Sequence, residues 1–203
     1  MVDASAPPDA TDPPTNAPQP TRAQPANQRP TSGTSTQTTP RRPPRRPAGD
    51  AANDAARGDP EGGRLAGVTA AHNAVRERLG VAPLVWDAGL ARYAQAWADK
   101  LKQRGCDLQH RPRKGADAQK YGENIYSASG SAPPASEVVG AWVEEVKDYD
   151  AKTNKCRGVC GHYTQVVWRA SRRLGCGMAT CGETEVWVCN YDPAGNFLGQ
   201  RPY

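Results

Sequence analysis

Six cysteines constrain this chain more than any other feature, because all of them lie between Cys106 and Cys189. An even number of cysteines confined to one stretch is typical of a disulfide framework, and such frameworks persist in oxidising compartments. Spacing alone leaves fifteen pairings open for six cysteines. We therefore expect three disulfides and a secreted, extracellular protein. The first ten residues, MVDASAPPDA, contain neither a basic n-region nor an apolar h-region, so we expect that a leader has been removed.

The first 63 residues differ in composition from the rest of the chain. They contain no Leu, Ile, Cys or aromatic residue, and they hold thirteen of the nineteen prolines. Such a segment buries too little apolar surface to offset the cost of ordering, which is about 1 to 2 kcal/mol per residue for the backbone. We therefore predict a disordered Pro/Thr/Ala-rich tether at residues 1–63 and one folded domain at residues 64–203.

The distribution of charge restricts the partners of this chain. Residues 1–63 carry seven basic and seven acidic side chains, so the motif RRPPRR at residues 41–46 is a local basic spot in a neutral segment. The net charge of +5 belongs to residues 64–203 and suits loose affinity for anionic cell-wall or membrane surfaces. We expect no sequence-specific nucleic-acid binding and a monomeric protein. No run of residues approaches the ~18 apolar residues of a membrane span.

Hydrophobic periodicity predicts three amphipathic helices in the folded region. The first spans residues 64–79, the second begins after its cap Asp87 and stops at Gly105, and the third spans residues 136–149. His72 shares the apolar face of the first helix. A lone histidine in such a place is usually a core residue whose ring is hydrogen-bonded, so we interpret His72 as structural.

The stretch GHYTQVVW at residues 161–168 places a titratable ring, that of His162, in an otherwise apolar and aromatic run. Residues 166–168 are predicted as the start of a buried strand. Farther along, residues 173–181 and 185–191 alternate in character and predict an antiparallel hairpin. A polar side chain is therefore expected close to the core, and His162 is the centre of the candidate site.

Eight motifs occur in a fixed order in the folded region: AHNAVR (71–76), LVWD (84–87), YAQAWA (93–98), YGENIY (121–126), WVEEVKDYD (142–150), GHYTQVVWR (161–169), RLGCGMATC (173–181) and VCNYDPAGNFLGQRPY (188–203). With these motifs, residues 64–203 resemble the CAP superfamily of cysteine-rich secretory proteins, antigen 5 and pathogenesis-related class-one proteins, whose common unit is the SCP domain. The six cysteines are placed as in the plant-type pathogenesis-related class-one members.

The resemblance implies an α+β fold, a three-layer α/β/α sandwich with a short, mainly antiparallel sheet. This architecture agrees with the helices and the hairpin predicted from periodicity. The resemblance also implies which of the fifteen cysteine pairings is present. The implied disulfides are Cys106–Cys181, Cys156–Cys160 and Cys176–Cys189.

The resemblance further implies a central cavity lined by His110, Glu123, Glu145 and His162. Two imidazole rings and two carboxylates, carried by four separate segments, form a mixed nitrogen and oxygen set that suits zinc or another divalent cation. The alternative is structural, because buried carboxylates commonly pair with imidazole rings and backbone amides simply to satisfy one another.

The resemblance implies a secreted binding or defence-type module, and some family members carry sterols or other lipids. Lipid-carrying members have an aromatic-rich loop that is absent here, since residues 150–160 contain no aromatic residue. A metal-dependent protease or hydrolase is the enzymatic alternative. The chain has no G-x-S-x-G or H-E-x-x-H motif and no spare thiol, so we assign no catalytic residue and favour a non-enzymatic role.

The C-terminal segment at residues 193–203, PAGNFLGQRPY, offers a third interpretation. It resembles the segment that plant relatives release as a defence signal, which would make this chain a peptide precursor. Its Pro, Gly and Asn residues favour instead a turn-rich end that packs on the domain.

Overall fold

Helices cover both faces of a central sheet in this computed structural model, which describes residues 2–4 and 61–203. Residue 1 and residues 5–60 lie outside the described residues, so the predicted tether stays a prediction there. Within the predicted tether, Val2–Ala4 differ from the expectation because they form a strand, β1. Strand pairing uses backbone groups, which a segment without large apolar residues also possesses.

The central sheet has the strand order β1-β3-β7-β6-β2. Strand β2 pairs in parallel with β6, and the other neighbouring strands pair antiparallel. The predicted hairpin is confirmed, because β6 and β7 pair along their whole length. A separate two-stranded sheet joins β4 (Tyr149–Asp150) to β5 (Lys155–Cys156). The remaining strands are β2 (Val85–Trp86), β3 (Gly122–Ser129), β6 (Arg173–Cys181) and β7 (Thr184–Asp192).

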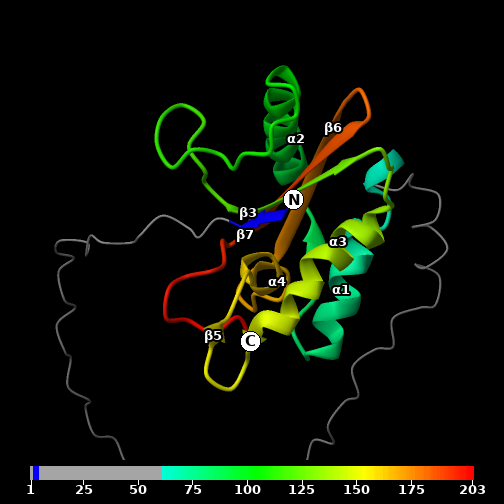
Figure 1. Cartoon of the computed structure of the whole chain (residues 1–203). Coiled ribbons are helices and arrows are strands. Elements are labelled where there is room, and N and C mark those ends of the chain that lie inside the picture. Colours follow the sequence, from blue (N-terminus) through cyan, green and yellow to red (C-terminus); the bar gives the residue numbers. More distant parts are fainter. Residues whose placement is uncertain (1, 5–60) are drawn as a thin grey trace, which may run out of the picture. The chain divides into compact units, whose positions relative to one another are not determined.

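The two faces of the sheet bury two separate apolar clusters, which confirms the three-layer α/β/α architecture (Figure 1). Helix α2 (Ala88–Gln103) packs on one face with Trp97 and Leu101. Helices α1 (Val68–Arg78), α3 (Ala135–Val143) and α4 (Gly161–Val166) pack on the other face. Side chains alternate between the faces along β7, so Val188 faces α2 whereas Trp187 faces the three-helix layer.

Two glycines of β6 allow α2 to lie directly on the sheet. A Cβ atom added at Gly175 would lie 2.2 Å from the backbone nitrogen of Ala91, and one at Gly177 would lie 2.4 Å from the Cα atom of Gln95. Both distances are far below a van der Waals contact, so any side chain at these positions would push the helix away. The glycines of RLGCGMATC therefore serve helix packing.

Three predicted elements have different boundaries or a different type. The first predicted helix divides into a 3-10 turn, η1 (Gly63–Leu65), and α1, because Gly67 between them has a left-handed φ of 84°. The third predicted helix changes at its midpoint from α3 to a 3-10 segment, η2 (Glu144–Asp148). The predicted strand at residues 166–168 is wrong, since α4 ends at Val166. A short apolar run is equally suited to a buried helix end and to a buried strand.

The structure confirms the three disulfides that the resemblance implies. Cys106–Cys181 fastens the end of α2 to the end of β6. Cys176–Cys189 joins directly opposite residues of β6 and β7. Cys156–Cys160 closes a short loop that connects β5 to the residue before α4. No free cysteine occurs in residues 61–203, which contain all six.

We predict that the three disulfides contribute unequally to stability. In the chain-entropy model the sequence separation of 75 residues gives Cys106–Cys181 about 4.5 kcal/mol, and the separation of 4 gives Cys156–Cys160 about 2 kcal/mol. The double variant Cys106→Ala/Cys181→Ala is therefore expected to lose more free energy of unfolding than the double variant Cys156→Ala/Cys160→Ala. Guanidinium denaturation of each variant measures the loss, and an equal or reversed order would contradict the prediction.

Candidate functional site

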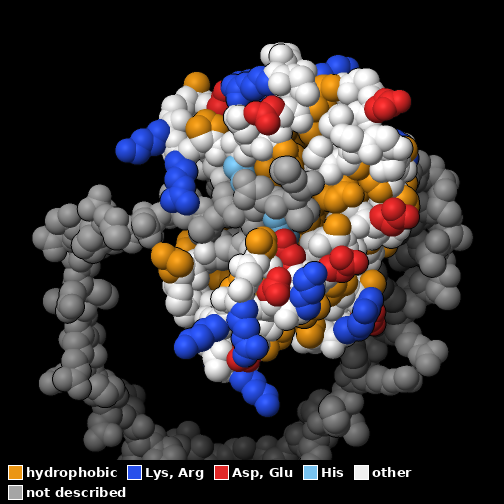
Figure 2. Space-filling model, in the orientation of Figure 1, with side chains coloured by type: hydrophobic (Ala, Val, Ile, Leu, Met, Phe, Trp, Pro, Cys, Tyr) orange, Lys and Arg blue, Asp and Glu red, His pale blue; other side chains and the backbone are white. Residues whose placement is uncertain are grey.

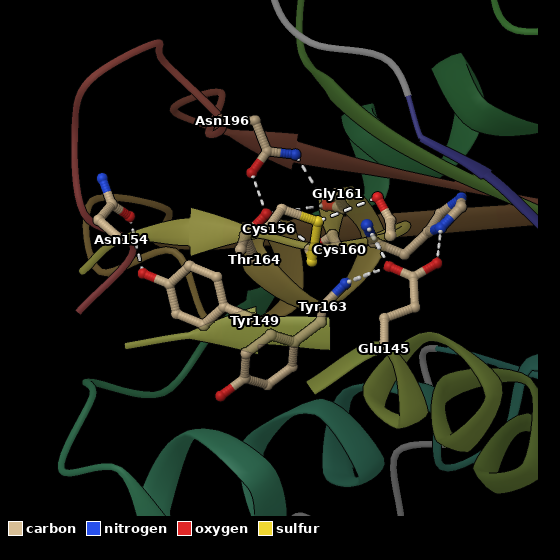
Figure 3. Close-up of a disulfide and its surroundings, with 11 residues drawn as sticks. Glu145, Tyr149, Asn154, Cys156, Cys160, Gly161, Tyr163, Thr164 and Asn196 are labelled. Atoms are coloured by element: carbon tan, nitrogen blue, oxygen red, sulfur yellow. Dashed lines mark hydrogen bonds and ion pairs between the residues drawn. A yellow bond between two sulfur atoms is a disulfide. The ribbon is translucent and has the colours of Figure 1, made fainter. Parts of the chain in front are cut away.

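The candidate site is built around the start of α4. There the carboxylate of Glu145, from η2, binds both the backbone amides of the helix and the ring of His162. Its Oε2 atom accepts hydrogen bonds from the backbone nitrogens of His162 (2.9 Å) and Tyr163 (3.2 Å). Cys160, at the N-cap position, makes no side-chain cap bond, so Glu145 supplies the cap from another segment. Figure 3 shows the Glu145 carboxylate facing the amide of Tyr163 beside the Cys156–Cys160 disulfide.

The same carboxylate fixes the imidazole ring of His162. The Nδ1 atom of His162 donates to the Oε1 atom of Glu145 over 2.5 Å. The ring of Trp142 stacks against that of His162, with an angle of 10° between the planes and 6.3 Å between the centroids. The Nε2 atom of His162 is buried and has no hydrogen-bond partner among residues 2–4 and 61–203. With Nδ1 carrying the proton, Nε2 presents a lone pair.

The second pair, His110 and Glu123, has a different environment. Glu123 of β3 accepts hydrogen bonds from Nδ1 of His110 (2.9 Å), the backbone nitrogen of Arg111 (3.0 Å) and Nδ2 of Asn190 (3.3 Å). The Nε atom of Arg111 lies 3.8 Å from Glu123, so a buried cation balances the buried carboxylate. Glu123 is thus held by several donors.

Arg111 is a site residue that sequence reasoning missed. Its guanidinium lies 3.8 Å from the ring centroid of Tyr93 and 5.1 Å from that of Trp97, and it donates to the carbonyl oxygen of Tyr93. The basic residues that follow His110 in the sequence are typical of an exposed loop, so the burial of Arg111 was not predicted. The one signal was the aromatic stripe of the second helix, which offers a surface on which a cation can stack.

The structure brings the four predicted cavity residues together as two pairs, one on each face of β3. Glu123 and Asn124 are neighbours on this strand and therefore point to opposite faces. Asn124 donates to the backbone oxygen of His162 (3.0 Å), which places His162 and Glu145 on the face of α1, α3 and α4. Among the described residues, no group of three or more His, Cys, Asp or Glu side chains is arranged to hold a metal ion. A single metal cavity formed by all four residues stays a prediction.

A buried network of hydrogen bonds leads from the backbone oxygen of His162 through Asn124 to Tyr191 and His72. Nδ1 of His72 donates to the backbone oxygen of Val68 (2.8 Å), so Nε2 of His72 accepts from the hydroxyl of Tyr191 (2.8 Å), which in turn accepts from Asn124 (3.2 Å). The structural interpretation of His72 is therefore confirmed. Burial lowers the pKa of His72 from 6.5 to about 4, so its ring is neutral at physiological pH.

Arg76 binds the backbone at the C-terminal end of α4. This fully buried side chain donates to the backbone oxygens of Val166 (2.9 Å), Trp168 (3.0 Å) and Ser171 (3.0 Å). These carbonyls belong to the end of α4 and the turn that follows it, where backbone oxygens lack helical partners. The sequence contains Arg76 in the motif AHNAVR, but a charged residue in a helix usually indicates a solvated face.

The C-terminal segment packs against α4. Asn196 donates to the backbone oxygen of Gly161 (2.7 Å) and accepts from the hydroxyl of Thr164 (2.6 Å), as Figure 3 shows. The hydroxyls of Tyr203 and Tyr163 lie 3.0 Å apart. These contacts favour the interpretation of residues 193–203 as a packed end of the domain. A cavity of about 270 Å³ lies between this segment, α4 and the β4–β5 hairpin.

Charged side chains of both signs occur on the face of the domain shown in Figure 2. On the face shown in Figure 2, Lys and Arg side chains alternate with Asp and Glu side chains and do not form one continuous basic patch. Binding to anionic surfaces therefore stays a prediction. In the described part of the chain, no helix has the length and apolar character needed to cross a membrane.

Comparisons with known proteins identify relatives of this chain. The family model described as "CAP: Cysteine-rich secretory protein family" matches residues 69–191. Pathogenesis-related protein 1 of Arabidopsis thaliana is 46% identical over 134 residues, which cover 66% of this chain and 78% of the relative. Pathogenesis-related protein 1B of Nicotiana tabacum is 46% identical over 136 residues, which cover 66% of this chain and 77% of the relative.

Solved structures share the fold. Venom allergen-like protein 4 of Schistosoma mansoni matches with a TM-score of 0.55 and 26% identity, covering 67% of this chain and 90% of that protein. The crystal structure of NaASP2 with Zn²⁺ matches with a TM-score of 0.55 and 24% identity, covering 67% of this chain and 82% of that protein. The second likeness shows the fold alone.

We predict that His72 makes stability depend on pH. The unfolded chain takes up a proton near pH 6.5 but the folded chain only near pH 4, so stability is full above pH 6.5 and is lost as the pH falls toward 4. The loss amounts to about 3 kcal/mol at 1.36 kcal/mol per pKa unit. In urea denaturation, His72→Gln is expected to lack this part of the pH dependence.

The matched control is Tyr191→Phe, which removes the hydroxyl partner but keeps the imidazole ring. It is expected to be less stable at every pH and to retain the acid-dependent loss. If the stability of His72→Gln falls with pH in parallel with that of the unaltered protein, His72 is not the titrating group.

Proposed function

This chain belongs to the cysteine-rich secretory protein family, and from that membership we propose that it is a secreted, defence-type binding module whose His162 ring holds a divalent cation. The defence-type assignment is supported by plant pathogenesis-related relatives at 46% identity. Secretion is supported by three disulfides, because such bonds persist in oxidising compartments.

One observation carries the cation proposal: the buried Nε2 atom of His162 has no hydrogen-bond partner in the described part of the chain, while Glu145 fixes Nδ1 of the same ring. Leaving a buried polar atom unpaired costs about 1 to 3 kcal/mol, so a ligand at Nε2 would relieve a standing cost. Metal-binding histidines commonly donate their other ring nitrogen to a carboxylate, which fixes the tautomer and orients the ring. The residues present fit this donor chemistry.

The Nδ1 atom of His110 likewise faces a carboxylate, that of Glu123, so this second ring is oriented in the same way. Neutral imidazole nitrogens suit Zn²⁺ and other divalent cations. In this proposal Glu145 orients the ring of His162, and water or a ligand completes the coordination. A bound cation would supply a Lewis-acidic centre for an anionic or carbonyl group of a partner molecule.

The geometry favours binding over hydrolysis. A general base must be within reach of a substrate proton, but Glu145 already accepts two backbone amides and an imidazole. Glu123 is likewise occupied by His110, Arg111 and Asn190. Neither carboxylate is placed to activate water, which supports a non-enzymatic role.

Sterol or lipid binding is a weaker candidate. The cavity beside α4 measures about 270 Å³, below the about 300 to 1,000 Å³ of pockets that enclose drug-sized ligands. Two larger pockets, of about 550 and 540 Å³, border Gly80 and Val81 after α1 and lie away from His162. Release of residues 193–203 as a signalling peptide would require breaking the contacts of Asn196 and Tyr203 with α4. Both ideas therefore rank below cation binding.

We predict that the protein binds Zn²⁺ through His162, as measured by isothermal titration calorimetry on metal-stripped protein. His162→Ala is expected to abolish the site. Glu145→Gln, which weakens the orientation of the ring, is expected to reduce affinity about 10- to 100-fold.

The matched control is Glu144→Gln, which removes one carboxylate at the neighbouring, exposed position. Its affinity should equal that of the unaltered protein. Thermal unfolding monitored by circular dichroism verifies that each variant is folded. Unchanged Zn²⁺ affinity in folded His162→Ala would reject the proposal.

A further inference from the structure

The outer edge of β3 carries an additional strand. Val2, Asp3 and Ala4 of β1 pair antiparallel with Tyr126, Ile125 and Asn124 of β3 (Figure 1). Without β1, β3 would be the last strand of the described sheet on this side. An edge strand presents unpaired N–H and C=O groups that act as a template for another extended chain. The structure therefore shows that this edge accepts an antiparallel partner.

The paired stretch of β3 coincides with the candidate site. Asn124, opposite Ala4, donates to the backbone oxygen of His162, and the adjacent Glu123 accepts from His110. Strand β1 also contacts α4, the helix that carries His162. A chain docked at residues 124–126 consequently runs along the border between the two His–Glu pairs.

We propose that the outer edge of β3 at residues 124–126 is a docking site for an extended peptide backbone, and that its resident occupant is Val2–Ala4 of the same chain. Recognition of this kind depends on main-chain hydrogen bonds, so it tolerates many side chains. In the described part of the chain, the occupant pairs through three residues. A longer extended peptide from another molecule can therefore compete for the edge and come to lie beside His162.

The test uses the full chain and hydrogen–deuterium exchange, read on a proteolytic fragment that covers β3. The variant Val2→Pro/Asp3→Pro/Ala4→Pro removes every backbone N–H group of β1, since proline has none. Exchange at those amides of residues 124–126 that do not bond β7 is expected to rise about tenfold or more, because their protection depends on local pairing. Exchange that matches the unaltered protein would overturn the proposal.

A matched control separates backbone from side-chain effects. Val2→Ala/Asp3→Ala changes two of the three side chains of β1 but keeps all three N–H groups. It is expected to protect β3 as the unaltered chain does. If this control loses protection as fully as the proline variant, side chains rather than backbone pairing hold β1, and backbone recognition is wrong.

A second measurement identifies the occupant. A synthetic peptide with the sequence of residues 1–8, added to the proline variant, is expected to restore protection of residues 124–126, whereas the same peptide N-methylated at residues 2–4 is not. Failure of both peptides would overturn the docking site. If protection in the unaltered protein increases with protein concentration and sedimentation shows dimers, the occupant comes from a second copy, which would overturn the intrachain assignment.

Discussion

The contact between Glu145 and the start of α4 is the interaction on which the candidate site depends. A helix of six residues is too short to be stable by itself, so its unpaired backbone groups must be satisfied from outside. Glu145 satisfies the first amides and orients the ring of His162 with the same carboxylate. Arg76 binds the carbonyls at the other end. The helix is thus held at both ends by buried charges of opposite sign, each placed where it complements the helix dipole.

The same contact explains why the site favours binding. A buried carboxylate needs several donors, and once it has them it is no longer available as a base. Glu145 and Glu123 both meet this requirement, with Arg111 as the balancing cation for Glu123. The group left to bind a ligand is the Nε2 atom of His162, which has no donor partner among the described residues. A rigidly supported ring with one unpaired, buried lone pair is suited to holding a ligand.

Residue patterns predicted the elements but not the contacts that assemble the site. Periodicity located α2 and the β6–β7 hairpin because each is long enough to repeat its pattern several times. It failed at residues 166–168, where three apolar residues fit a helix end as well as a strand. The roles of Arg76 and Arg111 could not be predicted, since their partners are backbone carbonyls and aromatic rings of distant segments. The disulfide pairing required the family resemblance, because spacing treats all fifteen pairings alike.

The position of α4 at the border of the sheet connects the imidazole to the edge of β3. A Cβ atom added at Gly122 would lie 2.3 Å from the Oε1 atom of Gln165 in α4, so the absence of a side chain at Gly122 lets the helix approach the strand. At the opposite border of the described sheet, β2 has only two residues and offers little template, whereas β3 has eight. Backbone pairing and an oriented ring nitrogen therefore occur together at one border. A ligand that uses both must be extended and must carry a group that binds either the ring nitrogen of His162 or a cation held there.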